Sequence, residues 1–127
     1  PELLERHVLE TVSDLGYEEW VMYSSFNHGM LANIKRFNPA TVTGVLYSVG
    51  RDFGRMPSKL ARRVGASVFV CAKREVTRRM LDDARTNGIA FYVYTLNSTS
   101  SVGRMIELGV DGILSDIADN IVQFVKR

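Results

Sequence analysis

The sequence predicts an α/β fold in which parallel strands alternate with helices. Short, nearly uninterrupted apolar runs recur about every 22 to 25 residues, which is the length of a strand–helix unit with short loops. Amphipathic segments with helical spacing lie between these runs. Because right-handed crossovers make successive strands parallel, we expect the loops that follow the strands to lie at one edge of the sheet.

Five apolar runs are predicted to be strands, and they are residues 20–23, 42–47, 67–71, 90–95 and 112–114. Six segments are predicted to be helices, and they are residues 3–15, 30–37, 57–64, 75–84, 100–108 and 117–125. Pro39 ends the second helix pattern and Pro57 opens the third. Glycines are expected to end four of the helices in the left-handed conformation, at positions 16, 65, 88 and 109.

Length and composition predict a single domain over residues 1–127. A hydrophobic share of 46% and a charged share of 24% exclude a disordered chain and a collagen-like chain. The single cysteine, Cys71, cannot form an internal bridge and is expected to be a buried structural thiol. No apolar run approaches the roughly 18 residues of a membrane span. Residues 1–6 do not resemble a signal peptide, so we expect a cytoplasmic location.

The loops after the predicted strands carry hydroxyls, amides and basic groups, and they are the places to look for chemistry. His28 stands near Ser24 and Ser25, where a Ser–His nucleophile pair is one interpretation. Helix capping and pocket lining are the favoured roles for His28. The glycine-bearing, basic loop over residues 48–55 suits a phosphate, but it lacks the known phosphate-loop spacings, and a solvated loop is the favoured interpretation.

Two kinds of site are not expected in this chain. Basic residues gather in the middle third, but acidic residues interleave with them and no aromatic stacking set accompanies them, so nucleic-acid binding is not expected. A hard cation needs two or more clustered oxygen ligands, and no Glu-x-Asp follows a predicted strand. We therefore expect no metal ligands.

Three segments in order carry a resemblance to a known family. They are residues 21–28 (VMYSSFNH) continuing to 43–46, residues 84–97 with Tyr-Val-Tyr-Thr-Leu-Asn at their end, and residues 109–116 (GVDGILSD). In order and spacing they are similar to the C-terminal part of the glycerophosphodiester phosphodiesterase family. The corresponding family strands end in Ser-Phe, in Trp-Thr-x-Asn and in Gly-Val-Asp-Gly-Ile-x-Thr-Asp. Tyr94 and Ser115 replace the family's tryptophan and threonine.

The resemblance implies the last five strands of a (β/α)8 TIM barrel that hydrolyses glycerophosphodiesters to an alcohol and glycerol phosphate. It also implies that six residues line the substrate pocket or brace the barrel mouth, namely Ser25, Phe26, Tyr94, Thr95, Asn97 and Asp116. The family's His-Arg and Glu-x-Asp motifs, its second histidine and its third-strand Glu and Lys cannot be placed in this chain. We therefore expect no catalytic residue here. A divalent metal, Ca²⁺ or Mg²⁺, is expected only for the complete family site.

An open sheet of five strands has physical consequences. A complete barrel of this kind needs roughly 200 to 250 residues, so the first and last strands would have unpaired edges. Apolar side chains of the barrel interior would also face water. We expect a homo-oligomer in which the edges pair between chains, or cover of the edges by the terminal helices. The alternative is a rearranged open sheet with helices on both faces.

These observations leave three functional interpretations. The first is a phosphodiesterase fragment that is inactive alone and active only when the missing strands come from elsewhere. The second is a non-catalytic, self-associating module that binds a glycerophosphodiester, a phosphate or a partner. The third is a flavodoxin-like five-strand domain such as a response receiver, which fits the number of units but lacks the clustered aspartates after the first strand.

Overall fold

The computed structural model describes residues 2–125. Its helices and strands follow in the order α1 (Glu2–Leu15), η1 (Glu18–Trp20), β1 (Met22–Ser25), α2 (His28–Phe37), β2 (Val42–Leu46), α3 (Val49–Asp52), α4 (Pro57–Val64), β3 (Val68–Ala72), η2 (Lys73–Glu75), α5 (Arg78–Thr86), β4 (Ala90–Tyr94), α6 (Thr99–Leu108), β5 (Gly112–Ile113) and α7 (Ala118–Val125). All five strands are parallel and lie in the order β1-β2-β3-β4-β5. This sequential order confirms the predicted alternation and differs from the 2-1-3-4-5 order of flavodoxin-like domains.

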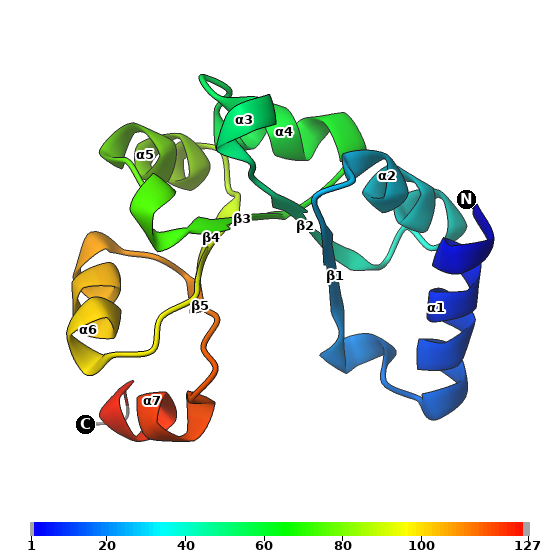
Figure 1. The fold of residues 1–127 in the computed structure, drawn as a ribbon. Helices are drawn as coiled ribbons and strands as arrows, with labels where there is room; N and C mark the ends of the chain where they lie inside the picture. Colours follow the sequence, from blue (N-terminus) through cyan, green and yellow to red (C-terminus); the bar gives the residue numbers. More distant parts are fainter. Residues whose placement is uncertain (1, 126–127) are drawn as a thin grey trace.

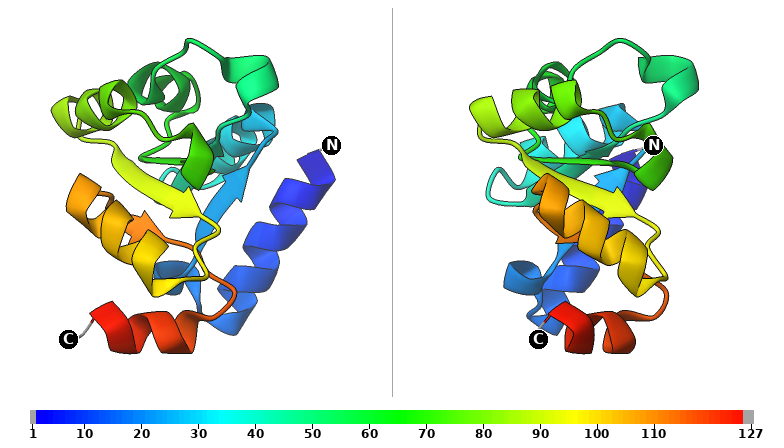
Figure 2. Two further views of the ribbon diagram at one scale, coloured as in Figure 1. Left: turned by 60° about the vertical axis from the view of Figure 1, so that its left-hand side comes forward. Right: turned by 90° about the vertical axis from the view of Figure 1, so that its left-hand side faces the viewer.

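The helices lie around the outside of one curved sheet, as in part of a barrel. Figure 1 shows this arc of elements, which is open between α7 and α1. The turned views in Figure 2 show the same arrangement, with the terminal helices at the two ends of the series. A rearranged sheet with helices on both faces therefore does not form. Each strand–helix unit instead keeps its apolar helix face on the convex side of the sheet.

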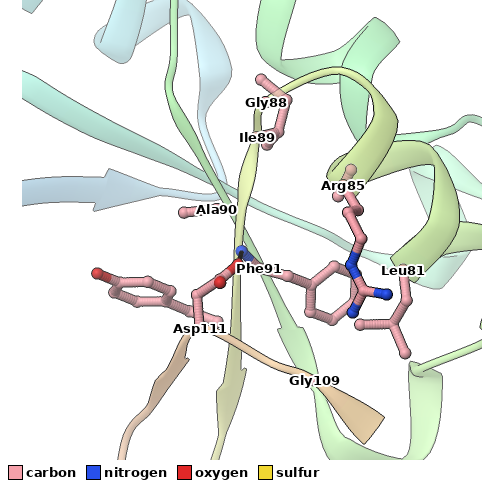
Figure 3. Close-up of a pocket in the computed structure, with 10 residues that line it drawn as sticks. Leu81, Arg85, Gly88, Ile89, Ala90, Phe91, Gly109 and Asp111 are labelled. Atoms are coloured by element: carbon pink, nitrogen blue, oxygen red, sulfur yellow. Dashed lines mark hydrogen bonds between the residues drawn. The ribbon is translucent and has the colours of Figure 1, made fainter.

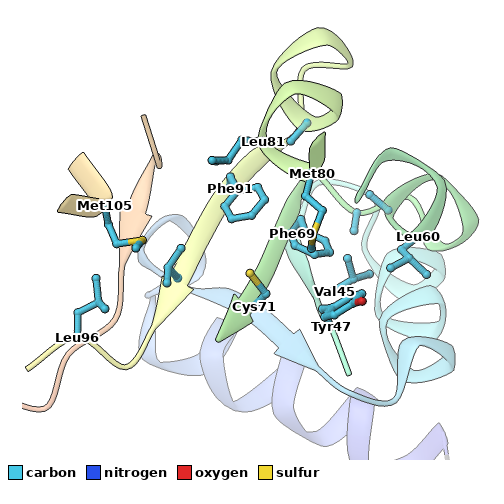
Figure 4. Packing of buried hydrophobic residues seen from close by; sticks show 14 of the residues in the cluster. Val45, Tyr47, Leu60, Phe69, Cys71, Met80, Leu81, Phe91, Leu96 and Met105 are labelled. Atoms are coloured by element: carbon cyan, nitrogen blue, oxygen red, sulfur yellow. The ribbon is translucent and has the colours of Figure 1, made fainter. Parts of the chain in front are cut away.

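The main core fills the space between the convex face of the sheet and the helices. Register pairing places Val45, Phe69 and Phe91 side by side on three adjacent strands, and all three are fully or almost fully buried. The rings of Phe69 and Phe91 lie 5.1 Å apart between centroids, and Tyr47 lies 5.6 Å from Phe69. Met80 of α5 and Leu60 of α4 pack over this row (Figure 4). These aromatic contacts fix the spacing of the central strands.

The concave face is more buried than an open half-barrel would suggest. Val68 and Val70 point to this face, yet only 4% and 1% of each is exposed. The curvature brings neighbouring strands close. A Cβ atom added at Gly44 would lie 3.2 Å from a methyl group of Val70, and one added at Gly112 would lie 2.6 Å from the Tyr92 ring. The expected exposure of apolar interior residues is therefore wrong for the middle of the sheet. It holds at the β1 end, where Val42 is 45% exposed.

Several predicted boundaries differ from the structure by one to three residues, and two of the differences have a clear cause. The first strand begins at Met22 and extends to Ser25, because residues 18–20 form the 3₁₀ turn η1, in which Trp20 is 83% exposed. The helix expected from residue 75 begins at Arg78, because residues 73–75 form the separate turn η2 and Thr77 caps α5 by accepting the N–H of Met80. The four helix-ending glycines, at positions 16, 65, 88 and 109, all have the predicted positive φ.

Each outer strand of the sheet borders an apolar cavity. One of about 360 Å³ lies between α1, α2 and β1, and another of about 380 Å³ lies between α6, β5 and α7. Several apolar side chains of the terminal elements are exposed, including Leu4 at 56%, Val122 at 48% and Val125 at 54%. No helix within residues 2–125 has the length and apolar character needed to cross a membrane.

Candidate functional site

The C-terminal ends of the strands bring the candidate residues to one edge of the sheet, which we call the rim. Figure 1 shows these strand ends and the loops that follow them. Two groups of interacting residues lie on the rim. The β1–β2 cluster consists of His28, Arg51 and Asp52 with the backbone of residues 26 and 46. The β4–β5 cluster consists of Asn97, Ser115 and Asp116, which are bonded to one another, and Tyr94 and Thr95 precede it at the end of β4.

A buried ion pair organises the β1–β2 cluster. Only 1% of the Asp52 side chain is exposed, whereas 43% of the Arg51 side chain is. Arg51 donates from Nε to Oδ1 of Asp52 at 2.8 Å and from Nη2 to Oδ2 at 2.6 Å, a two-point contact. Asp52 also accepts the N–H of Ser48 at 2.9 Å, which fixes the start of α3. Residues 48–55, which were expected to form a solvated loop, thus include the short helix α3 and are anchored at Asp52, and one of their two arginines, Arg51, is already paired.

The charges around Asp52 keep it ionised. Burial alone would raise the pKa of the Asp52 carboxyl, but hydrogen bonds from Arg51 and Ser48 and the nearby charges of Arg51 and His28 lower it below its ordinary value of 3.8. The same hydrogen bond raises the pKa of Arg51, against the opposing effect of burial. The pair is therefore a stable ionic contact.

Arg51 also ties together the ends of two strands. Its Nη1 donates to the carbonyl oxygen of Phe26, and its Nη2 lies 3.1 Å from the carbonyl oxygen of Leu46. His28 Nε2 lies 2.9 Å from the same Leu46 oxygen and 3.1 Å from Arg51 Nη2. The Leu46 oxygen can only accept, so His28 Nε2–H donates to it, and Arg51 Nη2 donates to the same oxygen and not to the histidine. The cluster is consequently a brace that holds the loop after β1 against the end of β2.

The structure does not form a Ser–His pair within the described residues. The Ser25 hydroxyl accepts the N–H of Asn27 at 2.9 Å, and His28 is bonded to the end of β2. Ser25 pairs in register with Val45 and shares its convex face. Asn27 caps α2 by accepting the N–H of Met30 at 3.3 Å, so the capping role expected of His28 belongs to Asn27. Phe26 follows the strand and is 48% exposed.

The β4–β5 cluster is built around one amide side chain. Asn97 donates to Oδ2 of Asp116 at 3.1 Å. Its Oδ1 accepts the N–H of Asp116 at 2.9 Å and the hydroxyl of Ser115 at 3.1 Å. Backbone bonds reinforce this contact, because Leu96 donates to the carbonyl of Leu114 at 3.0 Å. Asn97 therefore holds the loop after β4 to the loop after β5, and all of these polar side chains remain accessible to solvent.

Tyr94 is the candidate residue that faces the inside of the curved sheet. It ends β4 in register with Ala72, on the same face as Val68 and Val70. Burial raises the pKa of its hydroxyl, the charges of Glu75 and Cys71 add to that rise, and Arg74 opposes it. The peptide bond from Tyr94 to Thr95 is cis. Tyr94 therefore lies on the concave face of the sheet, at the C-terminal end of β4.

Sequence reasoning missed three rim residues as partners. Arg51 and Asp52 were interpreted as part of a solvated loop, although a charge pair just after a strand is a signal for an anchored loop. Glu75 was assigned to a helix, but its carboxylate accepts the N–H of Ala72 at 2.8 Å and closes the end of β3. The three-residue spacing between Ala72 and Glu75 is that of a capping box, of which only the bond from the Ala72 N–H to the Glu75 carboxylate forms, since alanine has no side-chain acceptor.

The described residues offer little for metal or nucleophilic chemistry. Among residues 2–125, no group of three or more His, Cys, Asp or Glu side chains is placed to hold a metal ion. Cys71 is fully buried, and burial raises the pKa of its thiol to about 12, with a further contribution from Glu75. This confirms the expected structural thiol, because the reactive form is the thiolate.

The six residues predicted to line a substrate pocket do not share one cavity in the structure. Asp116 lines a cavity of about 390 Å³ with the start of α7, and Ser25 lines the separate cavity beside β1. A further cavity of about 380 Å³ lies at the opposite end of the strands, between α5 and the starts of β4 and β5. Figure 3 shows Arg85 and Leu81 beside it, together with Asp111, which accepts the N–H of Phe91 at 2.8 Å. In barrel folds that end of the strands serves stability.

Comparison with known proteins places this architecture in a family. A sequence profile of the glycerophosphoryl diester phosphodiesterase family matches residues 1–120. The chain is 27% identical over 124 residues to a glycerophosphodiester phosphodiesterase of Caldanaerobacter subterraneus, covering 98% of this chain and 50% of that protein. It is 30% identical over 129 residues to the uncharacterized protein YqiK of Bacillus subtilis, covering 98% and 51% respectively.

Solved structures agree with the fold. A putative glycerophosphoryl diester phosphodiesterase from Silicibacter pomeroyi superposes with a TM-score of 0.85 at 23% identity, over 98% of this chain and 44% of that one. A phosphodiesterase from Oleispira antarctica, in complex with the product sn-glycerol-3-phosphate, gives 0.79 at 18% identity, over 97% and 50%. The chain thus spans about half the length of the relatives it matches. It belongs to the glycerophosphoryl diester phosphodiesterase family, as the C-terminal part of that barrel.

Proposed function

We propose that this chain forms the substrate-lining side of a glycerophosphodiester phosphodiesterase barrel and does not hydrolyse diesters by itself. One observation carries the proposal. The polar residues of β4 and β5 gather at the strand-end rim, where barrel enzymes place their sites, and they are amides, hydroxyls and a single carboxylate. Such groups bind and orient a phosphodiester. They lack a positioned acid–base pair for its hydrolysis.

The proposed ligand is the glycerol phosphate part of the substrate. The related Oleispira antarctica enzyme has this chemical group as its product, which supports the choice of substrate class. Tyr94 faces the concave side and would offer its hydroxyl to a phosphate oxygen or a glycerol hydroxyl. Asn97 and Asp116 would hold the two loops on either side at a fixed spacing. Arg51 would act indirectly, by fixing the backbone of Phe26.

A divalent metal does not fit the carboxylates present on this part of the rim. Asp52 is bonded to Arg51 and Ser48, Glu75 is bonded to Ala72, and Asp116 is bonded to Asn97. Calcium and magnesium sites need several free oxygen ligands together. We infer that the metal ligands and the acid–base residues would come from the strands that complete the barrel.

Ligand binding by the isolated chain tests the substrate-lining role. Adding sn-glycerol 3-phosphate in a ¹⁵N–¹H NMR titration should shift the amide signals of residues 94–97 and 115–116. Asn97→Ala should weaken binding about fivefold, because it releases two loops that face the ligand. Gln123→Ala is the matched control, since that exposed amide of α7 lies outside the cluster and outside the cavity that Asp116 lines. The proposal would be contradicted if the signals of residues 94–97 did not shift, or if both variants bound equally well.

We also propose that the chain self-associates through the two outer strands. The supporting observations are the unpaired edges of β1 and β5 and the apolar cavity beside each. Val122 and Val125 on α7 leave further apolar surface exposed. Light scattering of the purified chain should give a dimer or larger species. Val122→Lys should shift the population toward monomer, whereas Glu107→Lys, on the neighbouring helix α6, should not. A monomer at micromolar concentration would exclude this part of the proposal.

The alternative is a non-catalytic module that binds a phosphate or a partner. The same rim supports it, because binding and positioning groups are all that either function needs from this chain. The two functions differ in one respect. Adding a polypeptide with the missing first strands of a family member should restore hydrolysis if this chain is an enzyme half, and should have no effect if it is a binding module.

A further inference from the structure

A further cavity, which is lined by three basic residues, lies on the helix side of the sheet and contains no residue of the β4–β5 cluster. It measures about 450 Å³ and lies between the turn η2 and the outer face of α6. Lys73 and Arg74 contribute from η2, and Arg104 contributes from α6. These residues lie far apart in sequence. The fold brings them together because β3 and β4 are neighbours and their following segments pack side by side.

The three cations of this cavity have no counter-ion in the described structure. Lys73, Arg74 and Arg104 are exposed, and no hydrogen bond or ion pair engages their side chains among residues 2–125. Arg51, in contrast, is paired with Asp52. The nearest acidic side chain in η2, Glu75, is directed to the N–H of Ala72. Three like charges around one concavity repel one another, and an anion bound there would relieve that repulsion.

The remaining lining adds a hydroxyl donor and an apolar floor. Ser101 accepts a hydrogen bond from the hydroxyl of Ser98 at 2.8 Å, so the hydrogen of its own hydroxyl is available for another acceptor. Met105 is buried below it, and Leu108 continues the apolar surface along α6. Two guanidinium groups, an ammonium group and a hydroxyl match the oxygens of a phosphate, and the floor suits a short carbon chain attached to it.

We propose that this cavity is an anion site for a phosphate group, carried either by a small soluble phosphoester or by a lipid headgroup. The site lies beside the rim, because η2 directly follows β3, but it uses none of the residues of the β4–β5 cluster and does not rest on the proposed function. Arg74 connects the two places, because its charge also acts on the hydroxyl of Tyr94. A phosphate bound by Arg74 would therefore offset the charge that acts on the Tyr94 hydroxyl.

Inorganic phosphate is the first probe, in an NMR titration of the full chain at low ionic strength. Saturable shifts are expected for the amides of residues 73, 74, 101 and 104. Arg104→Gln should weaken binding about tenfold, and the double variant Lys73→Gln/Arg104→Gln should abolish it. Arg63→Gln removes the same charge from the exposed face of α4 and should leave binding unchanged. These side chains are exposed, and the spectra themselves report that each variant remains folded.

Two further arms identify the source of the phosphate. If the protein sediments with phosphatidylcholine vesicles that contain phosphatidic acid, and the Arg104→Gln variant does not, the site binds a lipid headgroup. Saturation by phosphate without sedimentation assigns it to a soluble phosphoester. Sodium chloride at matched ionic strength should produce no saturable shift. Equal shifts with chloride, or equal weakening by Arg63→Gln and Arg104→Gln, would overturn the proposal, because either result indicates general charge attraction.

Discussion

The two clusters of the rim use similar polar residues for different purposes. In the β1–β2 cluster, Asp52 is almost completely buried, and its carboxylate is bonded on both oxygens. In the β4–β5 cluster, Asn97 and Asp116 are exposed and bonded to each other. A buried charge loses much when its partner is removed, whereas an exposed contact is readily replaced by water. The first cluster therefore supports the fold, and the second is free to meet a ligand.

The largest effect is expected when the buried ion pair is broken. Asp52→Ala leaves Arg51 and the N–H of Ser48 without their acceptor. Removing one partner of a buried pair costs about 3 to 5 kcal/mol, and the partial exposure of Arg51 reduces this to about 2 to 3 kcal/mol. Urea unfolding measures the loss. Asp82→Ala, an exposed aspartate of α5, should change stability by less than about 0.5 kcal/mol.

If Asp52→Ala and Asp82→Ala lowered the unfolding free energy equally, the β1–β2 cluster would contribute no more to stability than an exposed side chain does. The NMR titration with sn-glycerol 3-phosphate sharpens the contrast further. The folded Asp52→Ala variant should still show the ligand-induced shifts at residues 94–97, because the hydrogen bonds of the β4–β5 cluster do not involve Asp52.

The lowered pKa of the Asp52 carboxyl predicts that stability depends on pH. The pKa of Asp52 is lower in the folded state than its ordinary value of 3.8. Its stabilising contribution is therefore fully present above pH 3.8 and is lost as the pH falls through the lower, folded pKa. The difference in unfolding free energy between wild type and Asp52→Asn should be constant from pH 7 to 5 and should shrink at more acidic pH. A difference that grows on acidification would contradict the assigned direction.

A smaller effect is expected in the β4–β5 cluster. Asn97→Ala removes three hydrogen bonds, but water can reach every group that is released. The loss of unfolding free energy should be about 0.5 to 1 kcal/mol. Thermal unfolding followed by circular dichroism measures it, with Gln123→Ala as the control. A loss as large as that of Asp52→Ala would show that this cluster supports the fold as well.

The smallest change concerns a buried hydroxyl near the start of β2, at the other end of that strand from the β1–β2 cluster. Thr43 of β2 is fully buried, and its hydroxyl has no hydrogen-bond partner among the described residues. Thr43→Val keeps the shape and removes the unpaired group, so stability should stay the same or rise by up to about 1 kcal/mol. Destabilisation measured by urea unfolding would indicate that the hydroxyl has a partner that the folded chain requires.

Much of the fold could be predicted because strand and helix patterns are local. The apolar runs around Phe69 and Phe91 predicted two strands, and the positions of four glycines predicted four helix ends. The first strand was misplaced because Trp20 is apolar yet exposed, a property that depends on what packs beside it. The brace formed by Arg51 could not be predicted, since it depends on carbonyl groups that the fold brings near, one of them 25 residues away from Arg51.

The candidate site could be predicted only in part. The resemblance identified Asn97 and Asp116 together, and the structure bonds them directly. It gave no sign of the Arg51 brace or of the cavity beside Arg104, because those depend on side chains from separate units meeting in space. Local motifs thus located the β4–β5 cluster, and only three-dimensional packing revealed its counterpart.

Hydrolysis of glycerophosphocholine by the purified 127-residue protein tests the central claim most directly. The assay measures released glycerol phosphate with and without added Mg²⁺ or Ca²⁺. We predict no turnover above the protein-free background with either metal, together with binding of sn-glycerol 3-phosphate at the β4–β5 cluster. Metal-dependent turnover by this chain alone would contradict the account, because it would place the acid–base and metal-binding groups within these residues.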